Sequence, residues 1–447
     1  EIRPRDWSSD VCSSDLQGYA LVEPGVSYFD LYRHLQDNKI RLWPDVPDPG
    51  WGSVMGNALD RGAGYTSFQY RNHFDAHCGM EVVLANGDVV RTGMGAMPNA
   101  KTWGAYKSGF GPYVDGIFSQ SNFGVVTKMG FWLMPEPDAY LRGIVYAPRY
   151  DDLIPLVEGM THLENTKVFQ GYPDLGSPLL GVPTLAGLHH FLVNGPPQRD
   201  AEYGALLQRG AGPREYEPYG QKHKLPFWSL GLTFYGPEKV IRAQWEHAQE
   251  RFRVSVKGAT FEEREFYKLP LTEEQKGKLE YPAMLGIPNL RTFAIGARSK
   301  LNPEHPTSGH IWFSPIIPRS GEAVLEANEV FRKASRELGI EMLTAFSLPI
   351  PSWERSFIFI MAFSVFRDPA INRKNRDAFR RLVEIAAEHG YGEYRTATSF
   401  YDDVMRAYSY NDHSLLRLHE TLKDAVDPNG ILSAGRYGIW PKHLRSV

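Results

Sequence analysis

Two short stretches near the C-terminus do most to decide the fold of this chain. The first reads Gly390-Tyr-Gly-Glu-Tyr-Arg-Thr396, and the second reads Asp427-Pro-Asn-Gly-Ile-Leu-Ser-Ala-Gly-Arg-Tyr-Gly-Ile-Trp-Pro441. The pair Tyr394-Arg395 follows the expected end of a helix, where an arginine most often caps carbonyl groups or pairs with a surface acid. The alternative is a guanidinium that binds an anionic ligand, and the rest of the chain has to decide between the two.

Length and composition limit the classes of protein to consider. The chain has 447 residues, which is too many for one simple core and favours two domains. Its net charge is −3, with both signs mixed along the chain, so nothing indicates a nucleic-acid or polybasic membrane surface. The longest apolar run, residues 356–366, is too short to span a bilayer and predicts a buried strand.

The two cysteines do not form a disulfide framework. Cys12 and Cys78 occur in neither a CxxC nor a histidine-flanked spacing. The adjacent pair His189-His190 has no carboxylate or cysteine at metal-ligand spacing, so we expect no metal site. Residues 1–16 carry two similar Ser-Ser-Asp runs and no apolar period, and we interpret them as a non-native artefact; a disordered tail is the alternative.

The first part of the chain alternates predicted strands with one helix. Residues 19–23 have strand-like alternation, and Ser27 with Asp30 predicts a capped helix that runs to about Asn38. Residues 80–84 and 88–91 predict a hairpin, with Asn86-Gly87 supplying a type I′ turn.

Later segments indicate a change of organisation. Residues 124–133 predict another strand, and from about residue 138 helical and strand-like segments mix, as in an α+β domain. Near the C-terminus, Ser414 can cap a helix whose stripe consists of Leu415, Leu418, Leu422 and Val426.

Two stretches have the composition of ligand-binding segments. Residues 56–65 place several glycines at close spacing, which would let backbone N–H groups approach a phosphate or a ring, although an ordinary surface loop is the commoner explanation. Residues 118–127 place Gln120, Ser121 and Asn122 directly before Gly124 and a β-branched strand. This pattern suits a strand that lines a ligand, and equally a polar loop that leads into a strand.

Two further residues, Asp48 and His310, can be either structural or functional. Asp48 stands between prolines, where a turn aspartate is the default and a functional carboxylate the minority option. His310 and Trp312 would lie on one face of a strand, because side chains alternate with period two. A single histidine on a strand is usually structural.

Together, these segments resemble one family in their order along the chain. From Gly18 to Val447 the sequence is similar to the vanillyl-alcohol oxidase and 4-cresol dehydrogenase flavoproteins, including the eugenol-oxidase group. The stretches that carry the resemblance are residues 19–25, 56–65, 79–95, 109–135, 309–315, 390–396 and 426–441. Residues 140–298 match poorly, apart from residues 225–245.

The resemblance implies an α+β, two-domain fold of the PCMH-type FAD-binding class, with an α+β cap domain over the flavin. It implies FAD-binding residues 17–137, a substrate or cap domain at 138–390, and a return to the FAD domain and active site at 391–447. The family's first half of the FAD domain, with the pyrophosphate loop, is expected to be missing, so we expect an N-terminally truncated chain that lacks its true N-terminus.

The resemblance also implies roles for single residues. His310 corresponds to the histidine bonded covalently to FAD in the oxidases, where cresol dehydrogenases use a tyrosine, and Trp312 to a substrate-pocket residue. Asp48, Tyr65, Tyr394 and Arg395 correspond to catalytic residues around the phenol. The expected cofactor contacts are His310, Gly56, Asn57, Arg61, Gly62, Gly64, Glu81, Gln120, Ser121, Asn122, Gly124, Val126 and Arg436.

The energy that these residues can supply is large enough to ionise a phenol. A phenol has a pKa of about 10, and lowering it by ~3 units requires about 4 kcal/mol. One guanidinium ~4 Å away at an effective dielectric of ~20 supplies roughly that energy, so Arg395, helped by Tyr394, could hold the phenolate. The resemblance then implies hydride transfer from the para-benzylic or allylic carbon to flavin N5 via a p-quinone methide, which water attacks with Asp48 as base. Arg436 would offset negative charge on the reduced flavin.

One segment departs from the family pattern. The family's Tyr-Thr-Pro-Tyr-Gly-Asp-His run is here Tyr65-Thr-Ser-Phe-Gln-Tyr-Arg-Asn-His73, with two extra residues that would alter the pocket wall.

The leading interpretation is therefore an FAD-dependent, oxidase-like enzyme of 4-alkylphenols or 4-hydroxybenzyl alcohols. The alternatives are a cytochrome-coupled 4-cresol-type dehydrogenase, a non-catalytic flavin-fold fragment and, less favoured, a sugar or lactone oxidase. The expected partners are a small phenol, O2 or a cytochrome c as electron acceptor, and a second copy of the chain in a homo-oligomer, with no nucleic acid and no membrane. We expect a cytoplasmic location.

Overall fold

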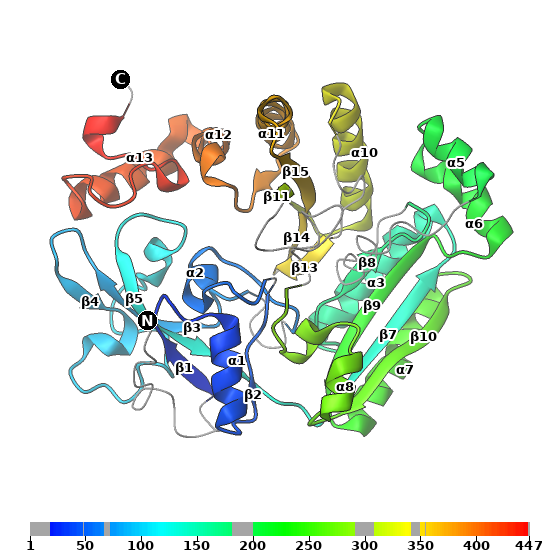
Figure 1. Ribbon diagram of the computed structural model, residues 1–447, viewed down its shortest axis with the longest axis horizontal. Helices are drawn as coiled ribbons and strands as arrows, with labels where there is room; N and C mark the ends of the chain where they lie inside the picture. The colour runs from blue at the N-terminus through cyan, green and yellow to red at the C-terminus, as the bar shows by residue number, and fades with distance from the viewer. Residues whose placement is uncertain are drawn as a thin grey trace. The chain divides into compact units, whose positions relative to one another are not determined.

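The chain forms two compact units in a computed structural model, shown in Figure 1. The structure describes residues 18–47, 49–66, 72–180, 200–290, 308–340, 349–353 and 355–445. Unit 1 consists of Glu1–Glu136, Pro282–Leu290 and Ala397–Val447, and unit 2 of Pro137–Tyr281 and Arg291–Thr396. Unit 1 is thus assembled from three separate stretches of sequence, including one short stretch inside the region assigned to the cap.

Unit 1 is built around a four-stranded antiparallel sheet. Its strand order is β1 (Tyr19–Val22), β5 (Val125–Trp132), β3 (His77–Val83) and β4 (Val89–Arg91). A separate small sheet pairs β2 (Leu42–Trp43) with β6 (Met134–Pro135). The helices of unit 1 are α1 (Tyr28–Asp37), α2 (Val54–Leu59), α12 (Tyr401–Ala407) and α13 (Tyr410–Val426).

The start of α1 confirms the predicted helix cap. The Ser27 hydroxyl accepts a hydrogen bond from the Asp30 N–H at 3.1 Å, and the Asp30 carboxylate accepts one from the Ser27 N–H at 3.1 Å. This reciprocal pairing satisfies N–H groups that the first turn cannot use internally. The helix buries Tyr28, Leu31 and Leu35 in a core that also contains residues of β1, β3 and β5.

The predicted hairpin is present, but its turn differs from the prediction. The N–H of Gly87 donates to the carbonyl of Leu84, and the Leu84 N–H donates to the carbonyl of Asp88. Gly87 has a φ of +90°, whereas Asn86 is not among the residues with positive φ. A type I′ turn needs positive φ at both central positions. The connection is therefore a three-residue loop in which only the glycine is left-handed.

The helix near the C-terminus starts close to the predicted cap, but its apolar stripe is only partly buried. Asn411, Asp412 and His413 have left-handed φ values, so regular helix begins only at about Ser414. Leu415 and Leu418 are exposed at 43% and 55%, while Leu422 and Val426 pack against the core of unit 1. The fully buried residue of this helix is Lys423.

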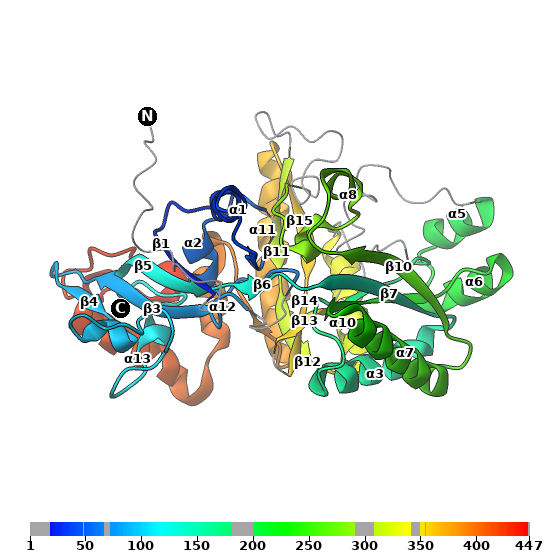
Figure 2. The same ribbon diagram turned by 90° about the horizontal axis from the view of Figure 1, so that it is seen from below.

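Unit 2 contains a second four-stranded antiparallel sheet. Its order is β10 (Thr260–Lys268), β7 (Ala139–Ala147), β9 (Trp228–Gly236) and β8 (Asp174–Gly176). The helix α7 (Glu238–Ser255) contacts β7, β9 and the helix α3 (Leu153–Asn165). Figure 2 shows α7 and α3 side by side next to β7. Shorter helices of this unit are α5 (Ala201–Gln208), α6 (Glu217–His223) and α8 (Glu273–Lys278).

The rest of unit 2 carries two further sheets. One has the order β13 (Pro349–Trp353), β14 (Ser356–Phe359), β12 (Pro315–Pro318) and β16 (Gly392–Glu393). The other pairs β11 (Ser308–Phe313) with β15 (Met361–Phe366). The helices α10 (Gly321–Leu338) and α11 (Pro369–Glu388) contact these sheets.

Aromatic side chains join the two helices to the two sheets. Phe313 on β11 contacts Phe331 on α10 and Phe379 on α11, with ring centroids 5.3 and 5.5 Å apart. Phe331 also contacts Phe359 on β14. The packing of these large apolar rings fixes the strands on which the candidate residues of unit 2 stand.

The apolar run at residues 356–366 forms two strands, not the single strand predicted. β14 and β15 lie on either side of Ile360 and belong to different sheets. Phe357, Ile358, Phe359 and Met361 are buried. Periodicity alone gave the burial correctly but could not show that the run changes sheets.

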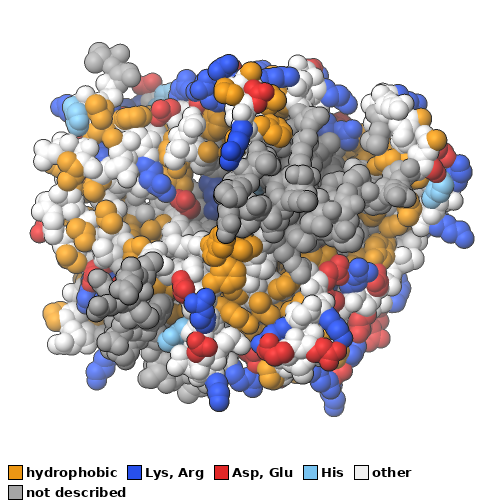
Figure 3. Space-filling model, in the orientation of Figure 1, with side chains coloured by type: hydrophobic (Ala, Val, Ile, Leu, Met, Phe, Trp, Pro, Cys, Tyr) orange, Lys and Arg blue, Asp and Glu red, His pale blue; other side chains and the backbone are white. Residues whose placement is uncertain are grey.

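The surface has no dominant sign of charge. On the face shown in Figure 3, basic and acidic side chains are interspersed. Among the described residues, no helix is both long enough and apolar enough to cross a membrane. Cys78 is buried, and burial raises its pKa to about 12, which makes it an unreactive thiol. Cys12, His189 and His190 lie outside the described residues, as does the segment 1–16.

Candidate active site

In unit 2, the strand β11 presents His310 and Trp312 on one face. Their ring centroids are 4.9 Å apart and the rings are nearly perpendicular. This confirms the alternation expected from the sequence. Burial lowers the pKa of His310, so the imidazole stays neutral at neutral pH and keeps a lone pair on one ring nitrogen.

The segment with Tyr394 and Arg395 is attached to the end of the same strand. The N–H of Tyr394 donates to the carbonyl of Ser314 at 3.0 Å, and the N–H of Ser314 donates to Glu393 Oε1 at 2.7 Å. Because Ser314 directly follows β11, these bonds couple the tyrosine–arginine pair to the strand that carries His310. The Arg395 guanidinium lies 5.1 Å from the centre of the Tyr394 ring, within cation–π range.

Glu393 was not among the residues singled out from the sequence. Its side chain is buried, and burial raises its pKa well above the usual value, against the opposing hydrogen bond from the Ser314 N–H. A neutral Glu393 would not cancel the charge of the adjacent Arg395. Nothing in the local sequence signals this, because a glutamate before a tyrosine is ordinarily exposed.

In unit 1, part of the predicted Gly-rich loop is helical. Gly56 and Asn57 belong to α2, whose first turn is capped by the Ser53 hydroxyl. The loop proper starts after the helix, where Arg61 has a φ of +54°. Gly62 is buried, and a Cβ there would lie 1.7 Å from Asn57 Oδ1, so a larger residue would displace the Asn57 side chain.

The second predicted stretch lies beside this loop. The N–H of Gln120 donates to the carbonyl of Leu59 at 2.9 Å, and the Arg61 guanidinium donates to Ser119 Oγ at 3.0 Å. Gln120 itself has a φ of +48°. Asn122 is buried, and its amide nitrogen donates to the carbonyls of Ser433 and Ile439 at 3.0 and 2.9 Å.

The C-terminal loop joins the other two segments through Arg436. Its guanidinium donates to Asp60 Oδ1 at 2.8 Å, and the hydroxyl of Tyr437 donates to the same oxygen at 2.8 Å. The structure therefore brings together three stretches that are far apart in the sequence: the Gly56–Gly64 region, the Gln120–Asn122 region and Arg436. No feature of the local sequence had marked Asp60 as the residue that joins them.

A buried ion pair anchors this C-terminal loop. Lys423 Nζ donates to Asp427 Oδ2 at 2.7 Å, to the carbonyl of Asn122 at 2.9 Å and to the carbonyl of Leu432 at 2.7 Å. Burial raises the pKa of Asp427, but hydrogen bonds from Lys423 and from two backbone N–H groups more than offset this, so the pKa lies below its usual value. The i,i+4 spacing of the pair was visible in the sequence, but such pairs are usually on the surface.

The structure shows the surroundings of most of the remaining predicted residues. Glu81 on β3 pairs with Arg91 and accepts a hydrogen bond from the Thr127 hydroxyl. Val126 packs in the hydrophobic core of unit 1. Ser121 and Gly124 are half-buried. Asp48 lies outside the described residues.

Tyr65 is buried, and a polar cluster that the sequence did not predict surrounds it. The carboxylate of Asp45 accepts hydrogen bonds from the N–H groups of Gly64 and Thr66, at 3.1 and 2.9 Å. It also contacts His73 Nε2 at 3.1 Å. Residues 67–71, in the segment that carries the two extra residues, lie outside the described residues, but His73, which follows them, is fully buried.

The three joined segments of unit 1 fit an FAD-binding role. Four of their residues other than glycine have positive φ values, namely Arg61, Gln120, Ser433 and Tyr437, and backbone strain of this kind clusters at ligand sites. The guanidinium groups of Arg61 and Arg436 suit the anionic parts of a flavin dinucleotide. Close glycines leave room for backbone N–H groups to approach the cofactor.

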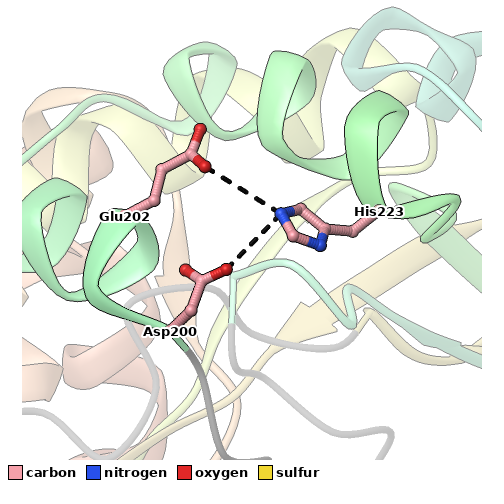
Figure 4. A group of neighbouring side chains, drawn as sticks. All are labelled: Asp200, Glu202 and His223. Carbon is pink, nitrogen blue, oxygen red and sulfur yellow. Dashed lines mark ion pairs between the residues drawn. The ribbon is translucent and has the colours of Figure 1, made fainter.

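One exposed group in unit 2 has ligand types that could hold a metal ion, as Figure 4 shows. His223 Nε2 lies 3.5 Å from an oxygen of Asp200 and 3.9 Å from one of Glu202. Lys222 also pairs with Glu202. These contacts are those of a surface ion-pair cluster, and we assign it no metal.

Comparison with known proteins agrees with this geometry. The family model "FAD binding domain" matches residues 8–93. The 4-cresol dehydrogenase flavoprotein subunit of Pseudomonas putida is 31% identical over 424 residues, covering 94% of this chain and 75% of that protein. The structure of 4-ethylphenol oxidase from Gulosibacter chungangensis in complex with isoeugenol has a TM-score of 0.77 and 32% identity, covering 99% of this chain and 80% of that one. That of p-cresol methylhydroxylase with substrate bound has a TM-score of 0.75 and 26% identity, covering 97% and 78%.

These matches confirm the predicted PCMH-type FAD-binding fold and FAD as the cofactor. A relative of this identity and coverage also settles the choice among flavoproteins that the sequence had left open, since sugar and lactone oxidases were among the candidates. The chain therefore belongs to the vanillyl-alcohol oxidase and 4-cresol dehydrogenase family of flavin-dependent, phenol-oxidising oxidoreductases.

Proposed function

We propose that this chain is an oxidase-like flavoenzyme that oxidises para-substituted phenols, 4-alkylphenols or 4-hydroxybenzyl alcohols, at the carbon next to the ring. The observation that carries the proposal is the tie between Ser314, at the end of the His310 strand, and Tyr394. It supports a site in which the residue for cofactor attachment and the residues for phenol binding stand on one rigid framework. Bound FAD would supply the hydride acceptor.

Arg395 and Tyr394 would bind the substrate as its phenolate. The protonated phenol, with a pKa of about 10, is a poor hydride donor, and Arg395 has to supply about 4 kcal/mol to lower that pKa by ~3 units. One close guanidinium is sufficient at an effective dielectric of ~20. Burial raises the pKa of Glu393 well above its usual value, which favours an uncharged neighbour for Arg395.

Loss of hydride from the phenolate would give a p-quinone methide. Water adds to this intermediate at the carbon that lost the hydride, next to the ring, and Asp48 is the proposed base that takes the proton of that water. Tyr65 would contact the phenol oxygen. Arg436 would offset negative charge near the ring of the cofactor.

His310 would hold the cofactor covalently. A neutral imidazole with a free lone pair is the form that can make such a bond, and burial of His310 favours that form. A histidine in this position also favours the oxidase branch over the cytochrome-coupled alternative. The likeness to the 4-cresol dehydrogenase subunit keeps that alternative open, with a cytochrome c as acceptor.

The decisive experiment is to purify the chain, precipitate it with acid and record the absorbance of the pellet and supernatant. We expect the yellow colour to stay with the polypeptide in the wild type and to enter the supernatant for His310→Ala. His389→Ala is the matched control, because His389 is an exposed histidine of the same unit, and it should behave as wild type. A colourless wild-type protein would instead support a non-catalytic flavin-fold fragment.

Turnover in air with 4-ethylphenol separates the two acceptors. We expect hydrogen peroxide in amounts that match the phenol consumed. Oxidation that proceeds only with an added cytochrome c or artificial dye would identify the dehydrogenase alternative. Size-exclusion chromatography of the same sample tests the expected homo-oligomer.

A further inference from the structure

A chain of buried polar groups in unit 1 ends on both sides of Tyr65. The Asp45 carboxylate accepts three hydrogen bonds from two residues: from the Gly64 N–H at 3.1 Å, and from the Thr66 N–H and hydroxyl at 2.9 and 2.7 Å. These residues immediately precede and follow Tyr65. The N–H of Tyr65 donates to the carbonyl of Val46 at 3.2 Å. The backbone N–H groups of three consecutive residues, 64 to 66, are therefore all hydrogen-bonded.

His73 orients that carboxylate. Its Nε2 lies 3.1 Å from Asp45 Oδ2, and its Nδ1 lies 2.8 Å from both the Asn57 amide nitrogen and the Tyr28 hydroxyl. An amide nitrogen can only donate, so His73 Nδ1 must accept. The proton of the ring is therefore on Nε2, where it is donated to Asp45.

The cluster packs closely against the loop at Gly64. A Cβ on Gly64 would lie 2.3 Å from Asp45 Oδ1, so the carboxylate and the loop backbone are in direct contact. Thr66 and His73 are 1% and 0% exposed. The Asp45 side chain is only 15% exposed, and a carboxylate that accepts several hydrogen bonds in such a place has a favoured orientation.

We propose that Asp45, oriented by His73, is a positioning residue that fixes the Tyr65 side chain for contact with the phenol oxygen of the substrate. This inference rests on the proposed function, because it deepens the role given there to Tyr65. Asp45 does not touch the substrate in this scheme. It acts on the substrate only through the backbone on either side of Tyr65.

A double-mutant cycle on binding and turnover tests the proposal, with Asp45→Asn, Tyr65→Phe and the double variant. Asn keeps the size of the side chain but replaces one accepting oxygen with a donor that faces either a backbone N–H or His73. We expect Asp45→Asn to weaken isoeugenol binding and kcat/KM for 4-ethylphenol about tenfold, and Tyr65→Phe to weaken them about 10- to 100-fold. In the Tyr65→Phe background, Asp45→Asn should have less than about a twofold further effect.

A second aspartate in unit 1 serves as a control, because it separates an effect of Asp45 on stability from an effect on substrate binding. Unit 1 holds a second buried aspartate–histidine pair, Asp115 with His77 Nε2 at 2.9 Å, each 1% exposed. Asp115→Asn should lower the melting temperature about as much as Asp45→Asn does, while isoeugenol affinity and kcat/KM stay within about twofold of wild type.

Two results would overturn the inference while leaving the proposed function intact. One is a wild type that binds and oxidises phenols, with effects of Asp45→Asn and Tyr65→Phe that simply multiply. The other is an Asp115→Asn variant that loses affinity as strongly as Asp45→Asn. A wild type that neither binds isoeugenol nor oxidises 4-ethylphenol would instead overturn the proposed function, and the role of Asp45 with it.

A second variant keeps the test decisive if Asp45→Asn does not fold. Thr66→Val removes only the hydroxyl that donates to Asp45 at 2.7 Å and preserves the shape of the side chain. We expect Thr66→Val to weaken isoeugenol binding and kcat/KM about threefold in the wild-type background, and to have little further effect in the Tyr65→Phe background. Additive effects in this cycle would equally contradict the positioning role.

Discussion

The two units place their candidate residues in different ways. In unit 2, strands place the candidate residues. His310 and Trp312 share one face of β11, and Tyr394 follows β16, which pairs with β12. In unit 1, the loops at Arg61, Gln120 and Arg436 are joined by side chains such as Asp60 and Lys423 that reach the backbone or side chains of distant segments. The periodicity of a strand can be seen in a sequence, whereas polar contacts between distant loops cannot.

The largest expected effect tests the unit 2 half of this comparison. Arg395→Met should reduce kcat/KM for 4-ethylphenol by roughly 1,000-fold, since about 4 kcal/mol of phenolate stabilisation is lost. Arg395→Lys should recover only part of this, because an ammonium group keeps the charge but not the planar donor pair of a guanidinium.

Steady-state kinetics of these variants and of Arg381→Met provide the measurement. Arg381 is on α11 in the same unit, exposed and paired with surface glutamates, and its variant should match wild type. If Arg395→Met kept most of the wild-type kcat/KM, the strand framework of unit 2 would have no role in binding the phenolate.

The next effect concerns the polar clusters of unit 1. Lys423→Met should lower the free energy of unfolding by about 3 kcal/mol, because it leaves the Asp427 carboxylate buried without its cation. Both side chains are 0% exposed. Chemical denaturation followed by tryptophan fluorescence gives this value.

The matched control is a surface lysine. Lys278 pairs with Glu274 in an exposed i,i+4 arrangement, and Lys278→Met should change the free energy of unfolding by less than about 0.5 kcal/mol. Equal losses in the two variants would show that the loop at Arg436 does not depend on the buried pair.

The smallest expected effect is a pH dependence in unit 2. Burial raises the pKa of Glu393 in the folded state above its unfolded value. The folded protein therefore binds the proton more tightly, and the stability that this gives is present at acid pH and is lost as the pH rises through the folded pKa. Glu393→Gln keeps the oxygen that accepts from Ser314 and removes the ionisable group.

We expect the melting temperature of Glu393→Gln to exceed that of wild type by about 2–4 °C at pH 7.5, and to equal it near pH 4.5. Scanning calorimetry across this range measures the difference. A wild type that is more stable than the variant at the higher pH would mean that Glu393 is ionised and pairs with a cation.

Much of the local structure could be predicted from single segments. The Ser27–Asp30 cap, the strand at residues 125–132 and the shared face of His310 and Trp312 are determined by short-range patterns, and the structure confirms all three. The errors arose where the outcome depends on distant packing. Asn86 stays out of the left-handed region, the run at residues 356–366 divides between two sheets, and Leu415 and Leu418 are exposed.

The sequence by itself determined the family, the cofactor and the types of residue that a phenol site needs, because these depend on motifs whose order along the chain is readable. Only the tertiary structure decided which residues hold those motifs in place. Asp45, Asp60, Glu393 and Lys423 are ordinary charged residues in the sequence, and their importance comes from burial and from partners far away in the chain. The energy of a charged group depends on its surroundings in three dimensions, which local sequence does not record.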